Sequence, residues 1–236
     1  MAAPVVETHA LGKTFGQHHA LRDVEMRVLP GRAIFVVGAN GAGKSTLLRI
    51  LAGLSAPTAG HALIFGLDSR RLSARYRRRI GMVAHQSYLY PNLTARENLE
   101  FYAELYALPD PRETAVRWLE RVGLERFADR RVRALSRGME QRLAAARAML
   151  AEPGLLLLDE PFASLDGEAV RIIMSLMRDA VARGASIVAG MHVVPEIEDL
   201  EFEVFDLARA TLTRRPPTRD GGDAGRIARL RSLLGR

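Results

Sequence analysis

Several residue types and features are absent from this chain of 236 residues. It contains no cysteine, which excludes a disulfide framework and any cysteine-ligated metal site. No apolar run approaches the roughly 18 residues that a membrane-spanning helix needs. The first residues, MAAPVVETHALGKTF, lack the basic and apolar regions of a signal peptide. These absences predict a soluble, cytosolic protein, long enough for one large domain or two small ones.

Lysine is scarce as well. Lys13 and Lys44 are the only two, so arginine supplies almost all of the positive charge. The chain has 34 Lys+Arg against 27 Asp+Glu, a net charge of +7 and a pI of about 10.4. Such a balance permits binding to nucleic acid or to an anionic membrane surface. An arginine-biased composition spread over solvated surfaces explains it more simply, so charge alone assigns no function.

The hydrophobic pattern predicts an α/β fold. Residues 5–11 and 23–29 alternate between apolar and polar, as in strands of a half-exposed antiparallel sheet. Continuous apolar runs predict strands that are buried on both faces, at 33–38, 80–85, 155–160 and 186–191. Because helical segments such as STLLRILAGL separate these strands, we expect a mainly parallel sheet with right-handed connections.

The middle of the chain predicts helices. Thr94 and Glu97 have the spacing of a capping box and precede an amphipathic run. Pro109 and Pro111 are expected to end that helix, and residues 112–124 predict another one. An all-helical segment is therefore expected to be inserted into the α/β fold.

The stretch GANGAGKST fits the phosphate-binding pattern G-x-x-x-x-G-K-[ST] in full. Gly38, Gly41 and Gly43 let the backbone curl so that successive N–H groups point at phosphate oxygens. The helix that follows adds the positive end of its dipole. Lys44 is suited to reach the β- and γ-phosphates, and the Ser45 hydroxyl is suited to bind Mg²⁺. The flanking buried strand and helix are the context that this motif requires.

Two acids end the buried run LLLLDE. Asp159 would lie at the carboxyl end of its strand, where α/β sheets bind ligands, and could hold Mg²⁺ through a water. Glu160 is suited to orient and deprotonate an attacking water. Alone, the pair could be a polar strand end, but together with the phosphate loop it predicts nucleotide hydrolysis.

The octet LSRGMEQR opens a helix at Ser136, which can cap the first turn. With the phosphate loop and the strand acids, this octet makes the chain from residue 3 to about residue 213 resemble the ATP-binding subunits of ABC transporters. The family signature is usually LSGGQQQR; Ser136 and Gly138 match it, whereas Arg137 and Met139 depart from it. The resemblance implies that this turn faces a nucleotide held by the other subunit of a head-to-tail dimer, rather than serving as a helix cap alone.

The resemblance also assigns roles to four isolated residues. Phe15 corresponds to the aromatic residue that stacks on adenine, and Gln86 to the glutamine that meets Mg²⁺ and water. Asp166 corresponds to the loop that contacts the opposite subunit, and His192 to the switch histidine on the γ-phosphate. Taken singly, a lone Phe is more often a core residue and a lone His more often structural.

The expected ligands are ATP and Mg²⁺, and the expected site residues form four groups. They are the ATP-binding residues Phe15, Gly38, Asn40, Gly41, Ala42, Gly43, Lys44, Ser45 and Thr46; the catalytic residues Glu160, His192 and Gln86; the magnesium ligands Ser45, Gln86 and Asp159; and, acting across the dimer, Ser136, Gly138 and Asp166.

The resemblance implies one ATPase domain over residues 1–213, with a P-loop NTPase core of mainly parallel sheet and an antiparallel β subdomain. A helical subdomain at about 87–150 is inserted in that core. Residues 214–236 form a basic tail rich in Pro, Gly and Arg, and its last ten residues are compatible with a short helix.

An ATPase of this kind is expected to pair with a second, identical subunit and to drive separate membrane subunits from the inner face of the membrane. Tyr88 to Pro91 suit an exposed apolar patch for that membrane partner, although they could equally pack under the helical insert. Residues 78–108 and 135–150 look most like the haem-exporter ATPase of cytochrome c maturation, and drug, lipid or polysaccharide exporters share much of this text.

A different class of function is an ABC ATPase that acts on nucleic acid or ribosomes. Relatives of that class carry long coiled coils, zinc modules or two cassettes in one chain. This chain has one compact insert between its nucleotide motifs, no cysteine and one cassette. A nucleic-acid partner is therefore not expected.

Overall fold

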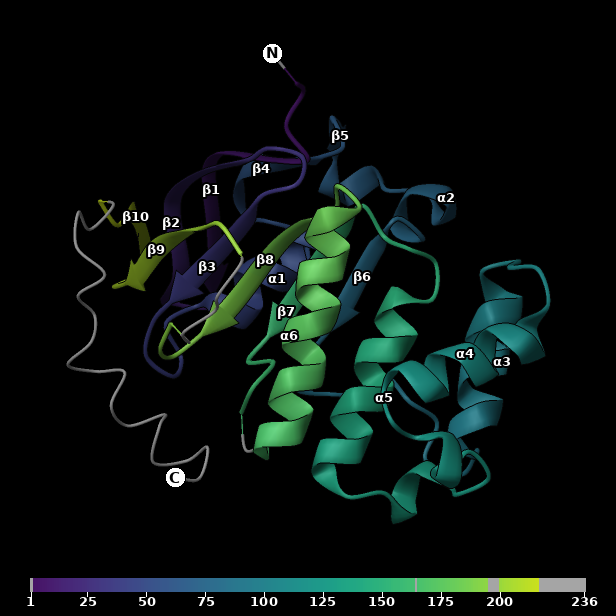
Figure 1. The fold of residues 1–236 in the computed structure, drawn as a ribbon. Helices are drawn as coiled ribbons and strands as arrows, with labels where there is room; N and C mark the ends of the chain where they lie inside the picture. Colours follow the sequence, from purple (N-terminus) through teal and green to yellow (C-terminus); the bar gives the residue numbers. More distant parts are fainter. Residues whose placement is uncertain (1, 164, 195–199, 217–236) are drawn as a thin grey trace.

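The computed structural model describes residues 2–163, 165–194 and 200–216. Figure 1 shows two sheets with helices packed beside them and a separate group of helices at one side. The predicted short helix in the tail lies outside the described residues. Among the described helices, none is both long and apolar enough to cross a membrane.

The larger sheet has the strand order β10-β9-β3-β8-β7-β6. Five neighbouring strands are parallel, and β10 pairs antiparallel with β9. All four continuous apolar runs form adjacent strands of this sheet, which confirms the predicted α/β fold. The strands are β3 (Ala33–Val37), β6 (Ile80–Val83), β7 (Leu155–Asp159), β8 (Ser186–Met191), β9 (Phe202–Ala208) and β10 (Thr211–Arg214).

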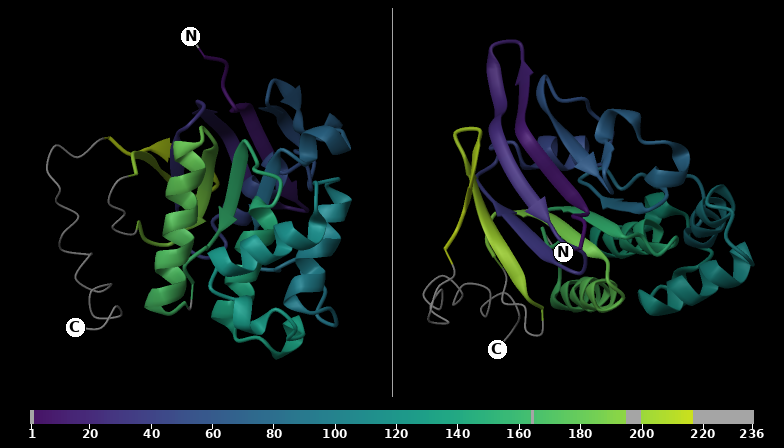
Figure 2. Two further views of the ribbon diagram at one scale, coloured as in Figure 1. Left: turned by 45° about the vertical axis from the view of Figure 1, so that its right-hand side comes forward. Right: turned by 90° about the horizontal axis from the view of Figure 1, so that it is seen from above.

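The smaller sheet is antiparallel and has the order β2-β1-β4-β5. In the right-hand view of Figure 2 this sheet lies above the parallel strands. The apolar residues of β1 and β2 pack against residues of those parallel strands. Two of its strands were expected from alternation; β4 and β5 have no counterpart among the predicted elements. The strands are β1 (Val6–Phe15), β2 (His18–Val28), β4 (Ala59–Ile64) and β5 (Leu67–Asp68).

Two short helices accompany this part of the chain. Helix α1 (Lys44–Leu51) follows the phosphate loop and packs against β7 and β8, whereas α2 (Ala74–Arg77) precedes β6. A 3₁₀ turn at Ser69–Arg71 lies between β5 and α2. Because α1 is fixed against two strands, its N-terminal end has a defined position at the edge of the sheet.

The helical group contains α3 (Ala95–Leu105), α4 (Pro111–Arg121) and α5 (Arg137–Met149), with 3₁₀ turns at Glu125–Phe127 and Val132–Ala134. The predicted capping box is present: Thr94 Oγ1 accepts from the N–H of Glu97, and Glu97 Oε2 accepts from the N–H of Thr94.

The expectation that prolines end the first of these helices is wrong. Helix α3 already stops at Leu105, followed by Ala107 with a φ of 49°, and Pro111 is the first residue of α4. Proline suits that position because the first N–H of a helix has no intrahelical partner.

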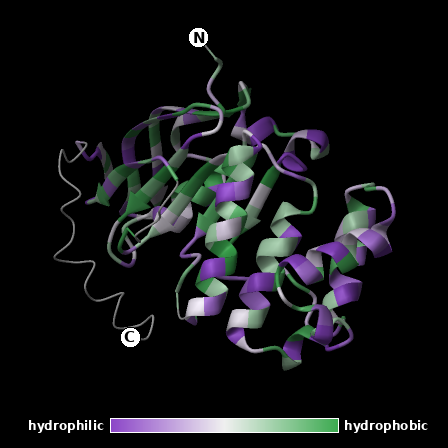
Figure 3. Ribbon diagram, in the orientation of Figure 1, coloured by the Kyte–Doolittle hydropathy of each residue, from purple (hydrophilic) through white to green (hydrophobic). Residues whose placement is uncertain are grey.

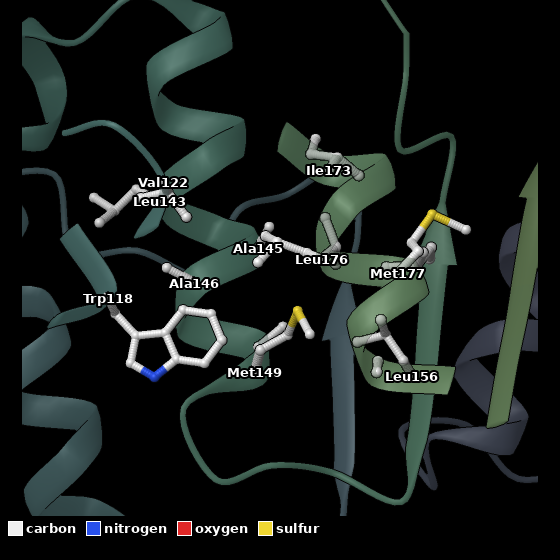
Figure 4. Packing of buried hydrophobic residues seen from close by; sticks show 14 of the residues in the cluster. Trp118, Val122, Leu143, Ala145, Ala146, Met149, Leu156, Ile173, Leu176 and Met177 are labelled. Atoms are coloured by element: carbon white, nitrogen blue, oxygen red, sulfur yellow. The ribbon is translucent and has the colours of Figure 1, made fainter. Parts of the chain in front are cut away.

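Helix α5 is the structural link between the helical group and the core. Figure 4 shows Trp118 of α4 on one side of it, and Ile173, Leu176 and Met177 of the next helix on the other. That next helix, α6 (Gly167–Ala182), has no counterpart among the predicted elements. Since every residue from Arg142 to Met149 is buried, α5 lacks a solvent face over its second half.

Hydropathy follows these layers. In Figure 3 the strands of the large sheet are mostly hydrophobic, whereas the helices at the outer side carry hydrophilic residues on their exposed faces. The polar side chains of greatest interest, Lys44 and Asp159, are exceptions because they are buried at the carboxyl ends of the strands.

The packing between β6 and α5 gives a stability prediction. A Cβ on Gly81 would lie 2.3 Å from the carbonyl oxygen of Ala148, whereas one on Gly154 would lie 3.4 Å from the Phe65 ring, an ordinary contact. Gly81→Ala should therefore lower the free energy of unfolding by about 1–3 kcal/mol. Gly154→Ala, the control, should change it by less than about 0.5 kcal/mol in urea unfolding. Equal effects would contradict the close packing described for β6 and α5.

Candidate nucleotide-binding site

The phosphate loop joins β3 to α1 at the carboxyl end of the parallel strands. Gly43 has a φ of 109°, and a Cβ there would lie 2.3 Å from the carbonyl oxygen of Ala20. At Gly38 a Cβ would lie 2.5 Å from the carbonyl oxygen of Leu207. Only glycine fits either position, and the exposed residues between them, Ala39 to Gly41, form the open rim of the loop.

Lys44 holds a buried positive charge inside this loop. Its side chain is 4% exposed, and Nζ donates to the carbonyl oxygens of Gly38 at 2.8 Å and Ala39 at 3.0 Å. Glu160 Oε1 lies 3.6 Å from the same nitrogen. The ammonium group is thus placed at the mouth of the loop, where an anionic ligand would meet it together with the N-terminal end of α1.

Asp159 ends β7 beside the loop. It is 7% exposed, its Oδ1 atom is buried without a hydrogen-bond partner, and the nearby Ser45 hydroxyl partly offsets the effect of burial on its pKa. Burial is the main cause that raises the pKa of this carboxyl, and the neighbouring Glu160 charge adds to it. A carboxylate oxygen without a partner next to a hydroxyl oxygen fits the hard oxygen ligands that Mg²⁺ prefers.

Glu160 stands in a turn directly after β7, with a φ of 51° and its N–H donating to the carbonyl oxygen of Gly190 at 2.8 Å. Positive φ in a residue with a side chain is uncommon and is often found at functional sites. The turn directs the carboxylate to His192, which follows β8: Glu160 Oε1 lies 2.9 Å from His192 Nε2. The carboxyl ends of three strands therefore bring Lys44, Asp159, Glu160 and His192 together.

Gly190 is a residue of this site that the sequence reasoning missed. A Cβ there would lie 3.2 Å from the Cβ of Lys44 and 3.5 Å from Asp159 Oδ1. A glycine inside an otherwise continuous apolar strand was the available signal, because such a glycine commonly marks a close approach.

Two further predicted residues, Phe15 and Gln86, are exposed. Phe15 is 54% exposed at the end of β1, with Lys13 Nζ 5.0 Å from its ring centroid. Gln86 is exposed in the loop after β6, and none of the hydrogen bonds among the described residues involves it. About half of the Phe15 surface is therefore open to solvent, and Gln86 makes no hydrogen bond to Ser45 or Asp159.

The signature turn lies at the start of α5. Ser136 caps that helix, accepting from the N–H of Met139 at 3.3 Å, and is itself exposed. Gly138 lies against the start of α6, where a Cβ on it would be 3.7 Å from Asp166 Oδ2. Asp166 in turn caps α6 by accepting from the N–H of Ala169 at 2.8 Å. No hydrogen bond or ion pair among the described residues joins this turn to the phosphate loop of the same chain.

The sequence profile of the ABC transporter family matches residues 21–163, more than half of the chain. The chain belongs to this family. Members of the family are ATPases that bind ATP with Mg²⁺, which agrees with the loop, the buried Lys44 and the unpartnered oxygen of Asp159.

Similar proteins of this family are named for different transported substrates. The molybdenum import ATP-binding protein ModC of Mycobacterium tuberculosis is 38% identical over 213 residues, covering 84% of this chain and 57% of that protein. The Nod factor export ATP-binding protein I of Ralstonia nicotianae is 34% identical, covering 91% and 68%. The phosphonates import ATP-binding protein PhnC 2 of a Synechococcus species is 41% identical, covering 75% and 71%. The chain thus spans little more than half the length of ModC.

Solved structures agree with the fold. A dimeric ATP-binding cassette in a post-hydrolysis state, bound to ADP and Pi, superposes with a TM-score of 0.81 at 29% identity. That match covers 91% of this chain and 99% of the other. The ATP-binding subunit of another ABC transporter gives a TM-score of 0.82 at 29% identity, covering 98% of this chain and 95% of the other.

The raised pKa of Asp159 gives a pH-dependent prediction for the nucleotide-free protein. Because the folded state holds this proton more tightly than the unfolded chain, ionisation of Asp159 costs stability once the pH exceeds the ordinary carboxyl range, and costs none below that range. Asp159→Asn should therefore raise Tm at pH 7.5 by about 2–4 °C, as about 1 kcal/mol does in a domain of this size.

Differential scanning calorimetry across pH 4 to 8 without nucleotide or Mg²⁺ checks this prediction. The gain should shrink towards pH 4, and Asp206→Asn is a suitable contrast because Arg215 lowers the pKa of Asp206. That substitution should lower Tm at neutral pH. A lower Tm in Asp159→Asn at pH 7.5 would contradict the assignment of a destabilising buried charge.

Proposed function

We propose that this chain is the ATP-hydrolysing subunit of an ABC transporter, working as a head-to-tail dimer around two Mg-ATP molecules. The convergence of Lys44, Asp159, Glu160 and His192 at the carboxyl ends of β3, β7 and β8 is the observation that carries the proposal. A buried cation at a glycine-rich loop binds phosphate, and a carboxylate beside it can accept a proton from water.

The proposed chemistry assigns one role to each of these side chains. Lys44 and the loop N–H groups hold the phosphates, while Ser45 and Asp159 hold Mg²⁺, which when bound neutralises developing charge on phosphate oxygens. Glu160 accepts the proton of the attacking water. His192, 2.9 Å from Glu160, orients that carboxylate and would contact the transferred phosphate. Gln86, exposed in the loop after β6, would meet Mg²⁺ and water, and Phe15 offers its exposed ring to adenine.

The second subunit supplies what one chain lacks. Ser136 and Gly138 are exposed or half-exposed at a helix N-terminus, a position that favours anions, yet they make no bond to the phosphate loop of their own chain. In the dimer they would close on the γ-phosphate held by the partner. Asp166, 3.7 Å from the position of a Cβ on Gly138, would accompany them to the interface.

Replacement of the proposed base tests the hydrolytic role. Glu160→Gln should keep ATP binding but lower kcat by about 10²–10⁴-fold, the contribution usual for general-base catalysis. Glu152→Gln, an exposed substitution in the turn before β7, is the matched control and should keep kcat. Phosphate release and nucleotide-binding assays on the purified chains measure both effects. Full turnover in Glu160→Gln would rule out the assigned base.

A charge substitution in the signature turn separates helix capping from nucleotide contact. Ser136→Asp keeps a good N-cap, so Tm should fall by less than about 2 °C. The new negative charge would face a γ-phosphate, so ATP-dependent dimerisation of the Glu160→Gln chain should be lost. Ser136→Thr retains both the cap and a neutral hydroxyl and is the control. Size-exclusion chromatography with ATP measures the dimer; an unaffected dimer in Ser136→Asp would show that Ser136 only caps α5.

We further infer a peripheral location on the inner face of the membrane, through a membrane subunit that contacts the loop after β6. The loop was expected either to form a partner surface or to pack under the helical insert, and its exposure supports both. Tyr90 and Pro91 are exposed, whereas Tyr88 and Leu89 are half-buried against the core. The Tyr90 ring meets Phe101 edge-on at 5.0 Å, and Leu105 on the same helix is 64% exposed. These residues support a smaller apolar patch centred on Tyr90 and Phe101.

The cargo is proposed from sequence resemblance alone. Residues 78–108 and 135–150 favour haem export for cytochrome c biogenesis, whereas the relatives named above are described for molybdenum, Nod factor and phosphonates. Affinity purification of the tagged chain from detergent-solubilised membranes of its own cell tests the partner. A stoichiometric multi-span protein is expected, with the Tyr90→Ser/Phe101→Ser chain recovering less of it. Ribosomal or nucleic-acid partners, without membrane protein, would favour the non-transport class.

A further inference from the structure

Arg147 lies in the buried half of α5 and plays no part in the site described above. It is 6% exposed, and its Nη2 donates to the carbonyl oxygens of Met82 at 2.7 Å and Ser87 at 3.2 Å. These two carbonyls stand on either side of Gln86, one at the end of β6 and one directly after the glutamine. One guanidinium group therefore holds both ends of the short segment that carries Gln86.

Three tyrosines enclose the same guanidinium. Its carbon lies 5.6 Å from the ring centroid of Tyr88 and 5.5 Å from that of Tyr102, within cation–π range. The nearby Tyr106 hydroxyl favours the charged form of the guanidinium and so raises its pKa, and the Tyr102 hydroxyl donates to the carbonyl oxygen of Tyr88. This group, Arg147 with Tyr88, Tyr102 and Tyr106, is called the tyrosine cage below.

Burying the charged guanidinium in the tyrosine cage costs desolvation free energy that packing alone would not require. No Asp or Glu forms an ion pair with Arg147 among the described residues, and its Nε atom is buried without a partner. Burial lowers the pKa of the guanidinium, although an arginine stays protonated at neutral pH. An apolar side chain of similar volume would avoid the desolvation of a charge. The directional bonds to Met82 and Ser87 are what an apolar residue could not supply.

The position of the cage connects two regions to which separate roles have been proposed. Helix α5 begins at the signature turn, and Arg147 lies ten residues after Arg137, about 15 Å further along the helix. On the other side of the tyrosine cage, the ring centroid of Tyr102 lies 6.3 Å from that of Tyr90, an exposed residue of the apolar patch. A rigid, buried helix moves as a unit, so a shift of the signature turn would displace the carbonyls that Arg147 holds.

We propose that Arg147 is a positioning residue that fixes the Gln86 segment to helix α5 and thereby holds Gln86 in place for ATP hydrolysis. The expected effect of Arg147 on turnover rests on the proposed ATPase function. The hold of Arg147 on the loop is independent of that function, because it is a property of one folded chain.

Hydrogen–deuterium exchange tests that hold directly. Arg147→Lys keeps the charge but loses the fork that reaches two carbonyls, and should speed amide exchange in residues 84–91 by at least about tenfold. Tyr102→Phe removes only the hydroxyl bond to Tyr88 and should act in the same direction more weakly. Arg142→Lys is the matched control: Arg142 is also buried in α5 but donates to Val122. It should leave exchange in residues 84–91 unchanged.

A double-mutant cycle with Gln86→Ala tests the consequence. Arg147→Lys alone should lower kcat by about tenfold with KM for Mg-ATP within about twofold, and should add nothing to the loss in Gln86→Ala. The proposal would be overturned if Arg147→Lys and Gln86→Ala lowered kcat independently, so that their effects multiply. It would also be overturned if Arg147→Lys and Tyr102→Phe both left amide exchange in residues 84–91 unchanged. If the unaltered chain hydrolyses no ATP, the proposed function fails, and the exchange measurement still decides whether Arg147 holds the loop.

Discussion

The buried ammonium of Lys44 is the interaction on which the site depends. A lysine 4% exposed must have partners in place of water, and here these are two carbonyls of its own loop and the carboxylate of Glu160 at 3.6 Å. The loop that supplies these carbonyls packs closely against neighbouring strands, where a Cβ on Gly38 or Gly43 would collide with backbone oxygens. Gly190 likewise leaves room for Lys44, because a Cβ there would lie 3.2 Å from the Cβ of Lys44. The fold brings a cation, two acids and a histidine together by ending β3, β7 and β8 at one edge.

Helix α5 has a second organising role. Its first turn is exposed and carries Ser136 and Gly138, whereas its second half is buried on all sides between α4, α6 and the sheet. The two buried arginines of this helix each donate to a carbonyl of another element, Arg142 to Val122 and Arg147 to Met82 and Ser87. The helix thus joins the signature turn, the end of α4 and the loop after β6 in a single rigid piece. Such a piece can transmit a small displacement without deforming the core.

Sequence patterns predicted the central sheet well because its strands are buried on both faces and read as continuous apolar runs. Residues 33–38, 80–85, 155–160 and 186–191 all contain strands of that sheet. Patterns failed where the signal was short or local. Strands β4 and β5 are brief and contain polar residues, and Pro111 was assigned to the end of one helix although it starts the next. Helix α6 carried an available signal, since Ala169, Ile173, Leu176, Met177 and Ala180 follow helical spacing.

By itself the sequence determined the local chemistry of this protein. The glycine spacing of the phosphate loop, the lysine and hydroxyl after it, and the acids after a buried run each follow from rules that act over a few residues. Only the tertiary structure decided which distant groups meet: Glu160 with His192 at 2.9 Å, Ser45 with Asp159, and Arg147 with the carbonyls on both sides of Gln86. These contacts join residues far apart along the chain, and they arise from the order of strands in the sheet and the burial of α5. Neither can be deduced from local spacing, because a hydrophobic pattern specifies which face is buried and not what is buried against it.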